Sequence, residues 1–383
     1  MMMVQPSNGG SNDGDDLHSV PLTVVKGAVA EGAVCLDGSP PVYQWAAGRG
    51  GGVKNWIIFL QGGGWCLNTT MQLPGRDSVE SCAARTTIFL GSSRHMAPAN
   101  FTQVLSPLSN TSYFYNWNRV FVRYCDGGSF AGNADKPDPV THVYYRGARI
   151  FDAVVRDLMA RGLRGARNVL FAGGSAGGLG AMIHCDRFCG HFPKNVVRVK
   201  CLADSSFFLR VKDPSRAEFL DRVFRTVVDV QRPHRALPAG CTSKMSAAAC
   251  FFPQNLLRYI KSPIFIINPV FDAYQIKTTF SVDLNNQVGN HTVISRSNVT
   301  LLQGFRREMI NALPPVKAGN GYLITSIYGH DFAIQTSYKI HMFGNNNRSK
   351  TIEDVVLDWF FDRTPNVYYI DPSDKPFFGP PHN

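Results

Sequence analysis

The sequence predicts an α/β fold with a mainly parallel central sheet flanked by helices. From Leu22 onwards, short apolar strands alternate with amphipathic helices, which is typical of βα units. Hydrophobic residues make up 44% of the 383 residues, which is enough for a large core and too many for a mostly disordered chain. Because no internal repeat or Pro-rich linker divides the sequence, we expect one domain over residues 21–383.

Apolar runs and helical periodicity place the expected elements in order along the chain. Apolar runs bounded by loop residues predict strands at 53–60, 119–124, 168–172, 261–270 and 321–327. Apolar residues at helical spacing predict helices at 146–163, 176–188 and 351–361. We expect residues 214–252 to form a helical insertion between two of the strands.

The charge and the first residues narrow the classes of partner. The chain carries 39 Lys and Arg against 28 Asp and Glu, a formal net charge of +11. These cations are scattered and no nucleic-acid-binding motif is present, so we expect no nucleic-acid partner; the charge favours another polyanion or serves solubility alone. No apolar run approaches the roughly 18 residues of a membrane span. Residues 1–20 are polar and acidic without the apolar core of a signal peptide, and we expect them to be disordered.

Cysteines and glycosylation sequons point to the secretory pathway. Nine cysteines are many for a reduced cytosolic enzyme, and their odd number leaves at least one thiol unpaired. A zinc site is not expected, because no CxxC pair or neighbouring His cluster exists. Asn-x-Ser/Thr sequons mark surface loops of secreted proteins. Six candidates for glycosylation occur: Asn68, Asn100, Asn110, Asn290, Asn298 and Asn347.

A G-x-S-x-G motif at residues 173–177 supplies a candidate nucleophile. It follows a predicted strand and precedes a predicted helix, the context that a nucleophile elbow requires. The sharp turn would expose the Oγ atom of Ser175 at the helix N-terminus. The motif alone leaves a second interpretation open, a Gly/Ser-rich turn that holds a phosphate.

Two strand ends later in the chain supply the partners of a Ser-Asp-His triad. An α/β-hydrolase has its acid after a late strand and its His after the last core strand. Asp272 and His330 stand at those places, in that order. Asp272 would hold the imidazole in one tautomer, and His330 would take the proton of Ser175. Singly, Asp272 also fits a capping residue and His330 a buried structural histidine; His184, His191, Asp331 and above all Asp204 are rivals for these roles.

The glycines after the first predicted strand are candidates for an oxyanion hole. Residues 62–64 resemble the HGGG-type loop of esterases, with Gln61 where His often stands. Backbone N–H groups there, together with that of Ala176 next to the nucleophile, would stabilise the developing charge. A plain tight turn is the alternative for these glycines.

Several blocks of sequence resemble those of plant pectin acetylesterases. They are GAVCLDGS (32–39), QGGGWC (61–66), RYCDG (123–127), YRGAR (145–149), SAGGL (175–179) and HCD (184–186). The resemblance runs from about residue 21 to 364, and the Notum carboxylesterases share the scheme more distantly. It implies an enzyme with an α/β-hydrolase-like fold that removes acetyl groups from galacturonan in the cell wall.

The resemblance also implies roles for individual residues. By position, Ser175, Asp272 and His330 match the triad of the family, and Gly63, Gly64 and Ala176 match its oxyanion donors. Four residues fall where related enzymes line the acyl pocket, although core packing explains the Phe residues as well: Trp65, Phe208, Phe251 and Phe252.

Family pairing suggests the disulfides and exposes differences from the family. The pairs it suggests are Cys35–Cys125 and Cys66–Cys82; Cys241 with Cys250 and Cys201 with Cys185 are further candidate pairs, which leaves Cys189 free. The family usually has Cys where Gly174, Ile327 and Asp331 stand here, and a Cys-rich tail. Disulfides around the site are therefore absent, and we expect the triad to be intact but the loop of His330 to be looser.

The combined interpretation is a secreted, monomeric serine esterase of the cell wall that acts on acetylated pectin through an acyl-enzyme, without a metal or another cofactor. A second interpretation keeps the chemistry and changes the substrate to another acylated polysaccharide, a small ester or a lipidated protein. A third, suggested by the missing cysteines near His330, is a catalytically weak wall-binding homologue.

Overall fold

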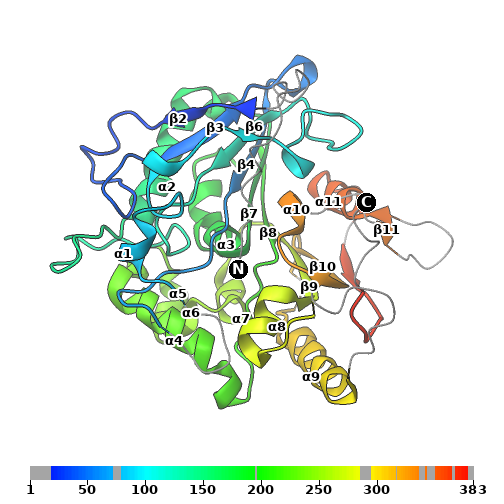
Figure 1. The fold of residues 1–383 in the computed structure, drawn as a ribbon. Coiled ribbons are helices and arrows are strands. Elements are labelled where there is room, and N and C mark those ends of the chain that lie inside the picture. The colour runs from blue at the N-terminus through cyan, green and yellow to red at the C-terminus, as the bar shows by residue number, and fades with distance from the viewer. Residues whose placement is uncertain are drawn as a thin grey trace, which may run out of the picture.

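The computed structural model describes residues 19–71, 79–194, 196–284, 295–315, 317–335, 341–342, 350–364 and 367–377. A nine-stranded sheet forms the centre of this part of the chain, in the order β13-β10-β9-β8-β7-β4-β6-β3-β2 (Figure 1). The strands are β2 (Leu22–Val24), β3 (Val42–Ala46), β4 (Asn55–Leu60), β6 (Asn118–Val122), β7 (Asn168–Gly174), β8 (Arg198–Asp204), β9 (Ile264–Asp272), β10 (Gly321–Gly329) and β13 (Tyr368–Ile370).

The sheet is parallel from β13 to β6, and only β3 and β2 at one edge pair in antiparallel fashion. All five predicted strands are present as β4, β6, β7, β9 and β10, and the mainly parallel α/β architecture is confirmed. Because parallel neighbours run in the same direction, the carboxyl ends of β7, β8, β9 and β10 lie in one row along the sheet, which we call its carboxyl edge. The candidate triad residues all follow strands that end at this edge.

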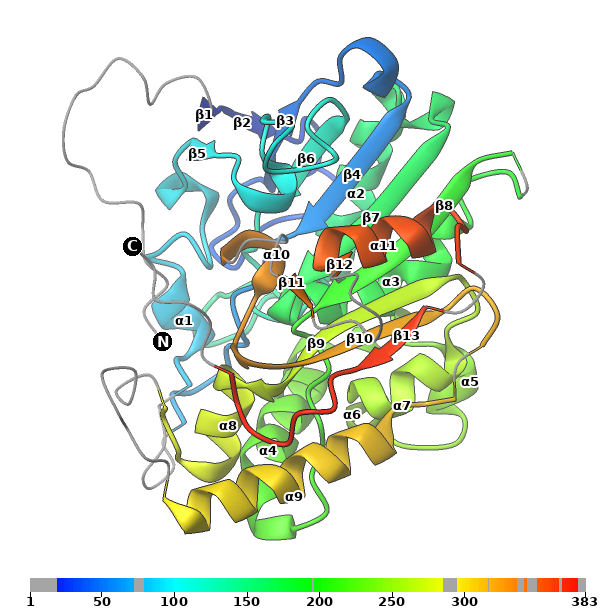
Figure 2. The same cartoon turned by 90° about the vertical axis from the view of Figure 1, so that its right-hand side faces the viewer.

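Two apolar cores cover the two faces of the sheet. In β4, Trp56 and Ile58 pack into one core while Ile57 and Phe59 pack into the other, as side-chain alternation along a strand requires. The first core includes α2 (Gly147–Ala160) and α3 (Ser175–Cys189), and the second includes α11 (Ile352–Phe360). Figure 2 shows α11 in front of the sheet and α3 behind it. The helices α2, α3 and α11 are the three that the sequence predicted at 146–163, 176–188 and 351–361.

The segment between β8 and β9 is helical and packs against the first core. It contains α4 (Pro214–Gln231), α5 (Ala239–Thr242), α6 (Ala247–Cys250) and α7 (Pro253–Leu256). Asp213 caps α4 by accepting a hydrogen bond from the backbone N–H of Ser215, and Pro214 opens the helix, where its missing donor does no harm. The remaining helices are α1 (Cys82–Arg85), α8 (Ala273–Phe280), α9 (Arg296–Ala312) and α10 (Phe332–Gln335).

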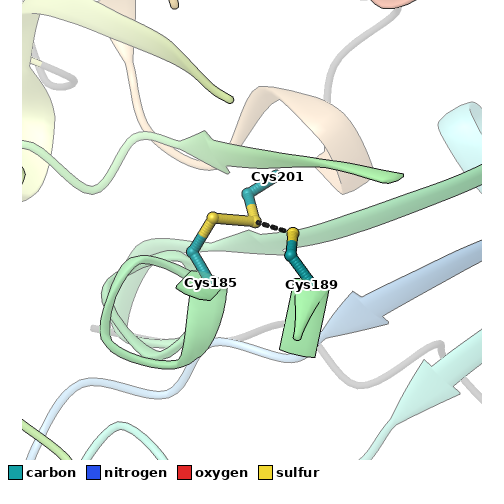
Figure 3. A group of neighbouring side chains, drawn as sticks. All are labelled: Cys185, Cys189 and Cys201. Atoms are coloured by element: carbon teal, nitrogen blue, oxygen red, sulfur yellow. Dashed lines mark hydrogen bonds between the residues drawn. A yellow bond between two sulfur atoms is a disulfide. The ribbon is translucent and has the colours of Figure 1, made fainter. Parts of the chain in front are cut away.

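Four disulfides join the two pairs suggested by the family resemblance and the two further candidate pairs: Cys35–Cys125, Cys66–Cys82, Cys185–Cys201 and Cys241–Cys250. Cys189 is the free thiol. Its Sγ atom lies 3.8 Å from that of Cys201, so a thiol stands beside a disulfide at the C-terminal end of α3 (Figure 3).

Short strands occur outside the central sheet, and one of them differs from our expectation for the N-terminal segment. Ser19 and Val20, which we assigned to the disordered N-terminal segment, form β1 (Ser19–Val20) with β5 (Ala99–Asn100) because the side chain of Val20 is buried; residues 1–18 lie outside the described residues. Two further short strands, β11 (His341–Met342) and β12 (Lys350–Thr351), pair with each other.

Three of the glycosylation candidates, Asn68, Asn100 and Asn110, are exposed, and Asn298 is half-buried on α9. Asn290 and Asn347 lie outside the described residues. Within the described ranges, no helix combines the length and the apolar character needed to cross a membrane.

Candidate active site

Ser175 stands at the sharp turn between β7 and α3. Its φ of +53° is in the left-handed region that a residue with a side chain rarely adopts, so the backbone is strained there, as in a nucleophile elbow. The helix begins at Ser175 itself, directly after Gly174, and the serine side chain is buried. The turn therefore presents Oγ at the carboxyl edge of the sheet, where β8, β9 and β10 also end.

Ser175, His330 and Asp272 form a continuous hydrogen-bonded chain. The Oγ atom of Ser175 lies 2.8 Å from Nε2 of His330, and Nδ1 of His330 lies 2.7 Å from Oδ2 of Asp272. Asp272 ends β9 and His330 follows β10, its parallel neighbour, where Asp272 is in register with Gly329. The other oxygen of Asp272 accepts a hydrogen bond from the backbone N–H of Gln275 and caps α8. The acid is thus both a capping residue and the partner of the imidazole.

Burial and the neighbouring carboxyl groups shift the pKa of His330 in opposite directions. Burial lowers the pKa of this imidazole, but the negative charge of Asp272 and its hydrogen bond raise it, and Asp331 and Asp204 add to the rise; the resulting pKa is about 9. The charged imidazolium is therefore well stabilised in this site, as the transient acid of an acyl transfer must be.

The rival residues occupy other places. Asp204 ends β8 and accepts hydrogen bonds from the hydroxyl of Ser205 and the backbone N–H of Ala333, and its pKa is raised to about 8, chiefly by burial. His184 is fully buried in α3, where its Nε2 donates to the carbonyl of Phe130. Burial lowers its pKa to about 4, so it is a neutral core histidine. His191 lies exposed beyond the end of α3.

The glycine loop after β4 lies against the nucleophile. A Cβ atom on Gly62 would be 2.9 Å from that of Ser175, so this position allows no side chain. Within the described ranges, no acceptor bonds the backbone N–H groups of Gly63, Gly64 or Ala176. Free N–H groups beside a nucleophile are the donors that an oxyanion requires.

The carbonyls of the same loop are held from behind. Arg85, the last residue of α1, donates to the carbonyls of Gly63 at 2.8 Å and Trp65 at 3.0 Å. The hydroxyl of Tyr124 donates to the carbonyl of Gly64 at 2.7 Å. A carbonyl lies in the same peptide plane as the N–H of the next residue, so the contact to Gly63 orients the N–H of Gly64 and the contact to Gly64 orients that of Trp65. Neither residue was expected at the site from the sequence; the RYCDG block that contains Tyr124 was the one available signal.

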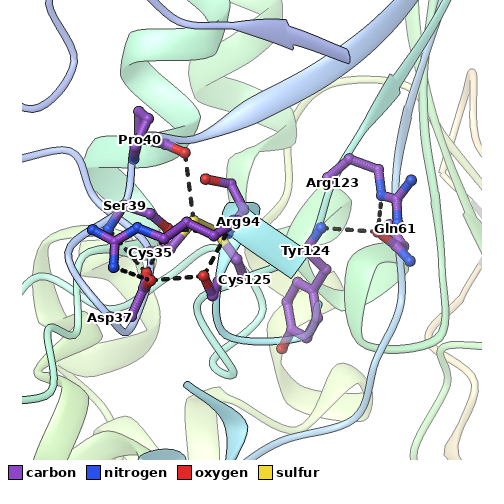
Figure 4. The surroundings of a disulfide bond; sticks show 11 residues. Cys35, Asp37, Ser39, Pro40, Gln61, Arg94, Arg123, Tyr124 and Cys125 are labelled. Atoms are coloured by element: carbon purple, nitrogen blue, oxygen red, sulfur yellow. Dashed lines mark hydrogen bonds and ion pairs between the residues drawn. A yellow bond between two sulfur atoms is a disulfide. The ribbon is translucent and has the colours of Figure 1, made fainter. Parts of the chain in front are cut away.

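Gln61 fixes the start of this loop. Its Oε1 accepts hydrogen bonds from Nε of Arg123 and from the backbone N–H of Tyr124, each at 3.0 Å. The two strand ends β4 and β6 are thereby tied together beside the Cys35–Cys125 disulfide (Figure 4). Gln61 therefore has a structural contact of its own, in the place where related esterase loops carry His.

An aromatic cluster surrounds the imidazole. The ring of Trp65 packs edge-on against Phe208 with centroids 4.9 Å apart, and Phe208 and Tyr274 lie 6.4 and 5.6 Å from the ring of His330. Tyr274, on the first turn of α8 after Asp272, was not expected. Phe251 and Phe252 contact Phe224 on α4 instead, behind Trp65, so the structure places them in the core beneath this wall.

Comparison with known proteins matches the chain almost end to end. The family model described as pectinacetylesterase matches residues 14–377. Pectin acetylesterase 11 of Arabidopsis thaliana is 37% identical over 362 residues, covering 91% of this chain and 89% of that protein. Pectin acetylesterase 7 of the same plant is 37% identical over 357 residues, covering 90% and 88%. The human palmitoleoyl-protein carboxylesterase NOTUM is 30% identical over 300 residues, covering 74% of this chain and 56% of its own.

Proposed function

The chain belongs to the pectinacetylesterase family and is a carboxylic ester hydrolase, and we propose that it removes acetyl groups from pectin with Ser175 as the nucleophile. The observation that carries the proposal is the hydrogen-bonded series from Ser175 through His330 to Asp272, next to a glycine loop with free N–H groups. The names of the plant relatives supply the substrate class.

In the proposed mechanism, the triad transfers one proton and forms one covalent intermediate. His330 Nε2 takes the Oγ proton of Ser175 while Oγ attacks the acetyl carbonyl carbon. The N–H groups of Gly63, Gly64 and Ala176 stabilise the resulting oxyanion, at about 2.7–4 kcal/mol for each donor. The imidazolium gives its proton to the sugar oxygen of the ester as the bond from the acetyl carbon to that oxygen breaks, which releases the sugar hydroxyl and leaves an acetyl ester on Ser175.

The second half of the reaction repeats the proton transfers with water. His330 accepts a proton from a water molecule while the oxygen of that water attacks the acetyl carbon of the acyl-enzyme. The imidazolium then returns a proton to Oγ of Ser175 as the bond from Oγ to the acetyl carbon breaks, which releases acetate and restores the enzyme. Throughout, Asp272 accepts the Nδ1–H hydrogen bond and holds the imidazole in one orientation. The proposed steps call on no metal or organic cofactor, because the triad carries the protons and the loop N–H groups stabilise the oxyanion.

Two further features support an extracellular polyanion as the substrate. Four disulfides and three exposed glycosylation sequons fit an oxidising secretory compartment, which leads us to propose secretion to the cell wall. The net charge of +11 would attract polygalacturonate, and such attraction weakens as salt increases. A monomer is sufficient for the proposed chemistry, since one chain supplies the whole triad.

Acetate release from acetylated pectin tests the proposal. The wild-type chain should release acetate, and Ser175→Ala should reduce the rate by about 10⁶-fold, to the background set by binding and the oxyanion hole. Ser243→Ala, an exchange of a serine remote from the triad in sequence and fold, serves as the matched control. Wild-type rates in Ser175→Ala would exclude Ser175 as the nucleophile. Release from acetylated xylan but not from pectin would keep the chemistry and reject the substrate.

The relationship to NOTUM makes a fatty acyl ester the second candidate substrate. A long acyl chain needs a deep apolar channel beside the serine. In this chain the ring centroids of Trp65 and Phe208 are 4.9 Å apart, and that of Tyr274 lies 6.0 Å from Phe208 and 6.3 Å from Trp65. This close packing favours a short acyl group. Comparing hydrolysis of p-nitrophenyl acetate and p-nitrophenyl octanoate separates the two candidates.

A further inference from the structure

Asp331, directly after the histidine of the proposed triad, places a second carboxyl group in the site. Its φ is +64°, and the residue is 5% exposed. The backbone N–H of Asp331 donates to the hydroxyl of Ser205 at 2.8 Å, whereas Oδ1 has no hydrogen-bond partner. A buried carboxyl oxygen without a hydrogen-bond partner destabilises the fold, which points to a role of this carboxyl beside the reacting groups.

Gly174 leaves the space that this carboxyl occupies. A Cβ atom built on Gly174 would overlap Oδ1 of Asp331, so the residue before the nucleophile and the residue after the histidine are in direct contact. The absence of a side chain at Gly174 is therefore what admits Asp331 to the site. Since Gly174 also precedes Ser175, the carboxyl sits between the two strand ends that carry the nucleophile and the base.

Asp204 on the neighbouring strand joins this group. The hydroxyl of Ser205 donates to Oδ1 of Asp204 at 2.9 Å while it accepts from the backbone of Asp331. Oδ2 of Asp204 accepts from the backbone N–H of Ala333. The loop that carries His330 is thus tied at two amides to the end of β8. Within the described ranges, neither carboxyl forms an ion pair with Lys or Arg, and the charge of His330 lowers the pKa of both.

We propose that Asp331 is a positioning residue of the site, whose buried carboxyl, together with Asp204, sets the pH at which His330 becomes free to accept the proton of Ser175. This inference rests on the proposed esterase function. The groups that face Asp331 are His330 on its own loop, Asp272 at the end of β9, Asp204 at the end of β8 and the uncharged Gly174 at the end of β7. A negative charge here stabilises the imidazolium and delays its deprotonation as pH rises.

The directions of the pKa shifts agree with this geometry. Burial raises the pKa of Asp331, the charge of His330 lowers it, and the charge of Asp272 raises it again. Burial and the charge of Asp331 raise the pKa of Asp204 to about 8. His330, with three carboxyls around it, has a pKa of about 9. Removing one of the carboxyls should lower the pKa of the imidazole, and the enzyme should then become active at lower pH.

The test compares pH profiles of Asp331→Asn and the wild type. With p-nitrophenyl acetate as substrate, we expect the acid limb of kcat/KM to move down by about one pH unit, so that activity below the limb rises about tenfold. Asp229→Asn, which removes an exposed carboxyl on α4, is the matched control and should leave the limb in place. Asp204→Asn should move the limb in the same direction, and it keeps the idea testable if Asp331→Asn does not fold.

A second readout separates this inference from the substrate proposal. The rate at which a fluorophosphonate labels Ser175 depends on the same imidazole but on no natural substrate, and its acid limb should move by the same amount. A lower plateau with an unmoved limb in both assays would mean that Asp331 only supports the loop, and the inference would be wrong. A limb that moves upward would also overturn it. Wild-type protein that is not labelled at any pH would instead refute the proposed function.

Discussion

Replacing Tyr124 by Phe tests whether the glycine loop depends on the contacts behind it. The Tyr124 side chain is fully buried, and its hydroxyl bridges two backbone groups: it donates to the carbonyl of Gly64 at 2.7 Å and accepts from the N–H of Ser129 at 2.9 Å. Tyr124→Phe removes only the hydroxyl and keeps the ring. Both backbone groups then lose their partner.

The contacts set the expected magnitude. A buried polar group left without a hydrogen bond costs about 1–3 kcal/mol, which gives about 2–6 kcal/mol for the two groups. Because Gly64 is half-buried and water can reach its carbonyl, we expect the lower half of this range. The carbonyl of Gly64 shares its peptide plane with the N–H of Trp65, so losing the hydroxyl acts on the N–H of Gly64 through a shift of the backbone at Gly64. If that shift turns the N–H of Gly64 away from the oxyanion, kcat should fall by about 10²–10³-fold, the usual effect of losing one such donor.

The measurements are the free energy of unfolding by urea and the kcat for p-nitrophenyl acetate. Tyr145→Phe is the matched control, because Tyr145 is equally buried but its hydroxyl has no hydrogen-bond partner. We expect that control to keep or slightly gain stability and to retain full kcat. A Tyr124→Phe protein that matches Tyr145→Phe in both measurements would refute the reasoning that the hydroxyl orients the loop.

Three further predictions concern stability and specificity. Burial lowers the pKa of His184 from 6.5 to about 4. The contribution of this neutral imidazole to the free energy of unfolding is therefore complete above pH 6.5 and falls by about 3 kcal/mol as the pH drops toward 4. Urea unfolding measured across this pH range should show a smaller loss of stability in His184→Gln than in the wild type. The Cys185–Cys201 disulfide closes a loop over a separation of 16 residues, so Cys201→Ala should lower the unfolding free energy by about 3 kcal/mol while Cys189→Ala leaves it unchanged. Trp65→Ala opens the aromatic wall and should raise hydrolysis of p-nitrophenyl butyrate relative to acetate by about tenfold; an unchanged ratio would show that Trp65 does not limit acyl length.

Much of the site was predictable because its signals are local. A glycine-rich turn between a strand and a helix predicted the conformation at Ser175, and polar residues directly after apolar runs predicted Asp272 and His330 at strand ends. The choice between Asp272 and Asp204 was not local. Each ends a strand at the same edge, and only the pairing of β9 with β10 brings Asp272 to the imidazole.

Contacts between loops that are distant in the sequence could not be predicted from sequence patterns. Arg85 ends a four-residue helix with no chemical motif, yet its guanidinium holds two carbonyls of the glycine loop. The expected wall residues Phe251 and Phe252 lie behind Trp65, while Tyr274 stands beside His330. An apolar side chain on a helix is equally suited to a core or a wall, and its surroundings decide which it becomes.

By itself, the sequence determined the α/β class, the family and the strand-end positions of the proposed triad, because periodicity and turn glycines act over short stretches of chain. Only the tertiary structure decided which acid reaches His330, which carbonyls Arg85 and Tyr124 hold, and that Asp331 occupies the space left by Gly174. Those contacts depend on the order of strands in the sheet, and hydrogen bonds between distant strand ends exist only once that order has formed.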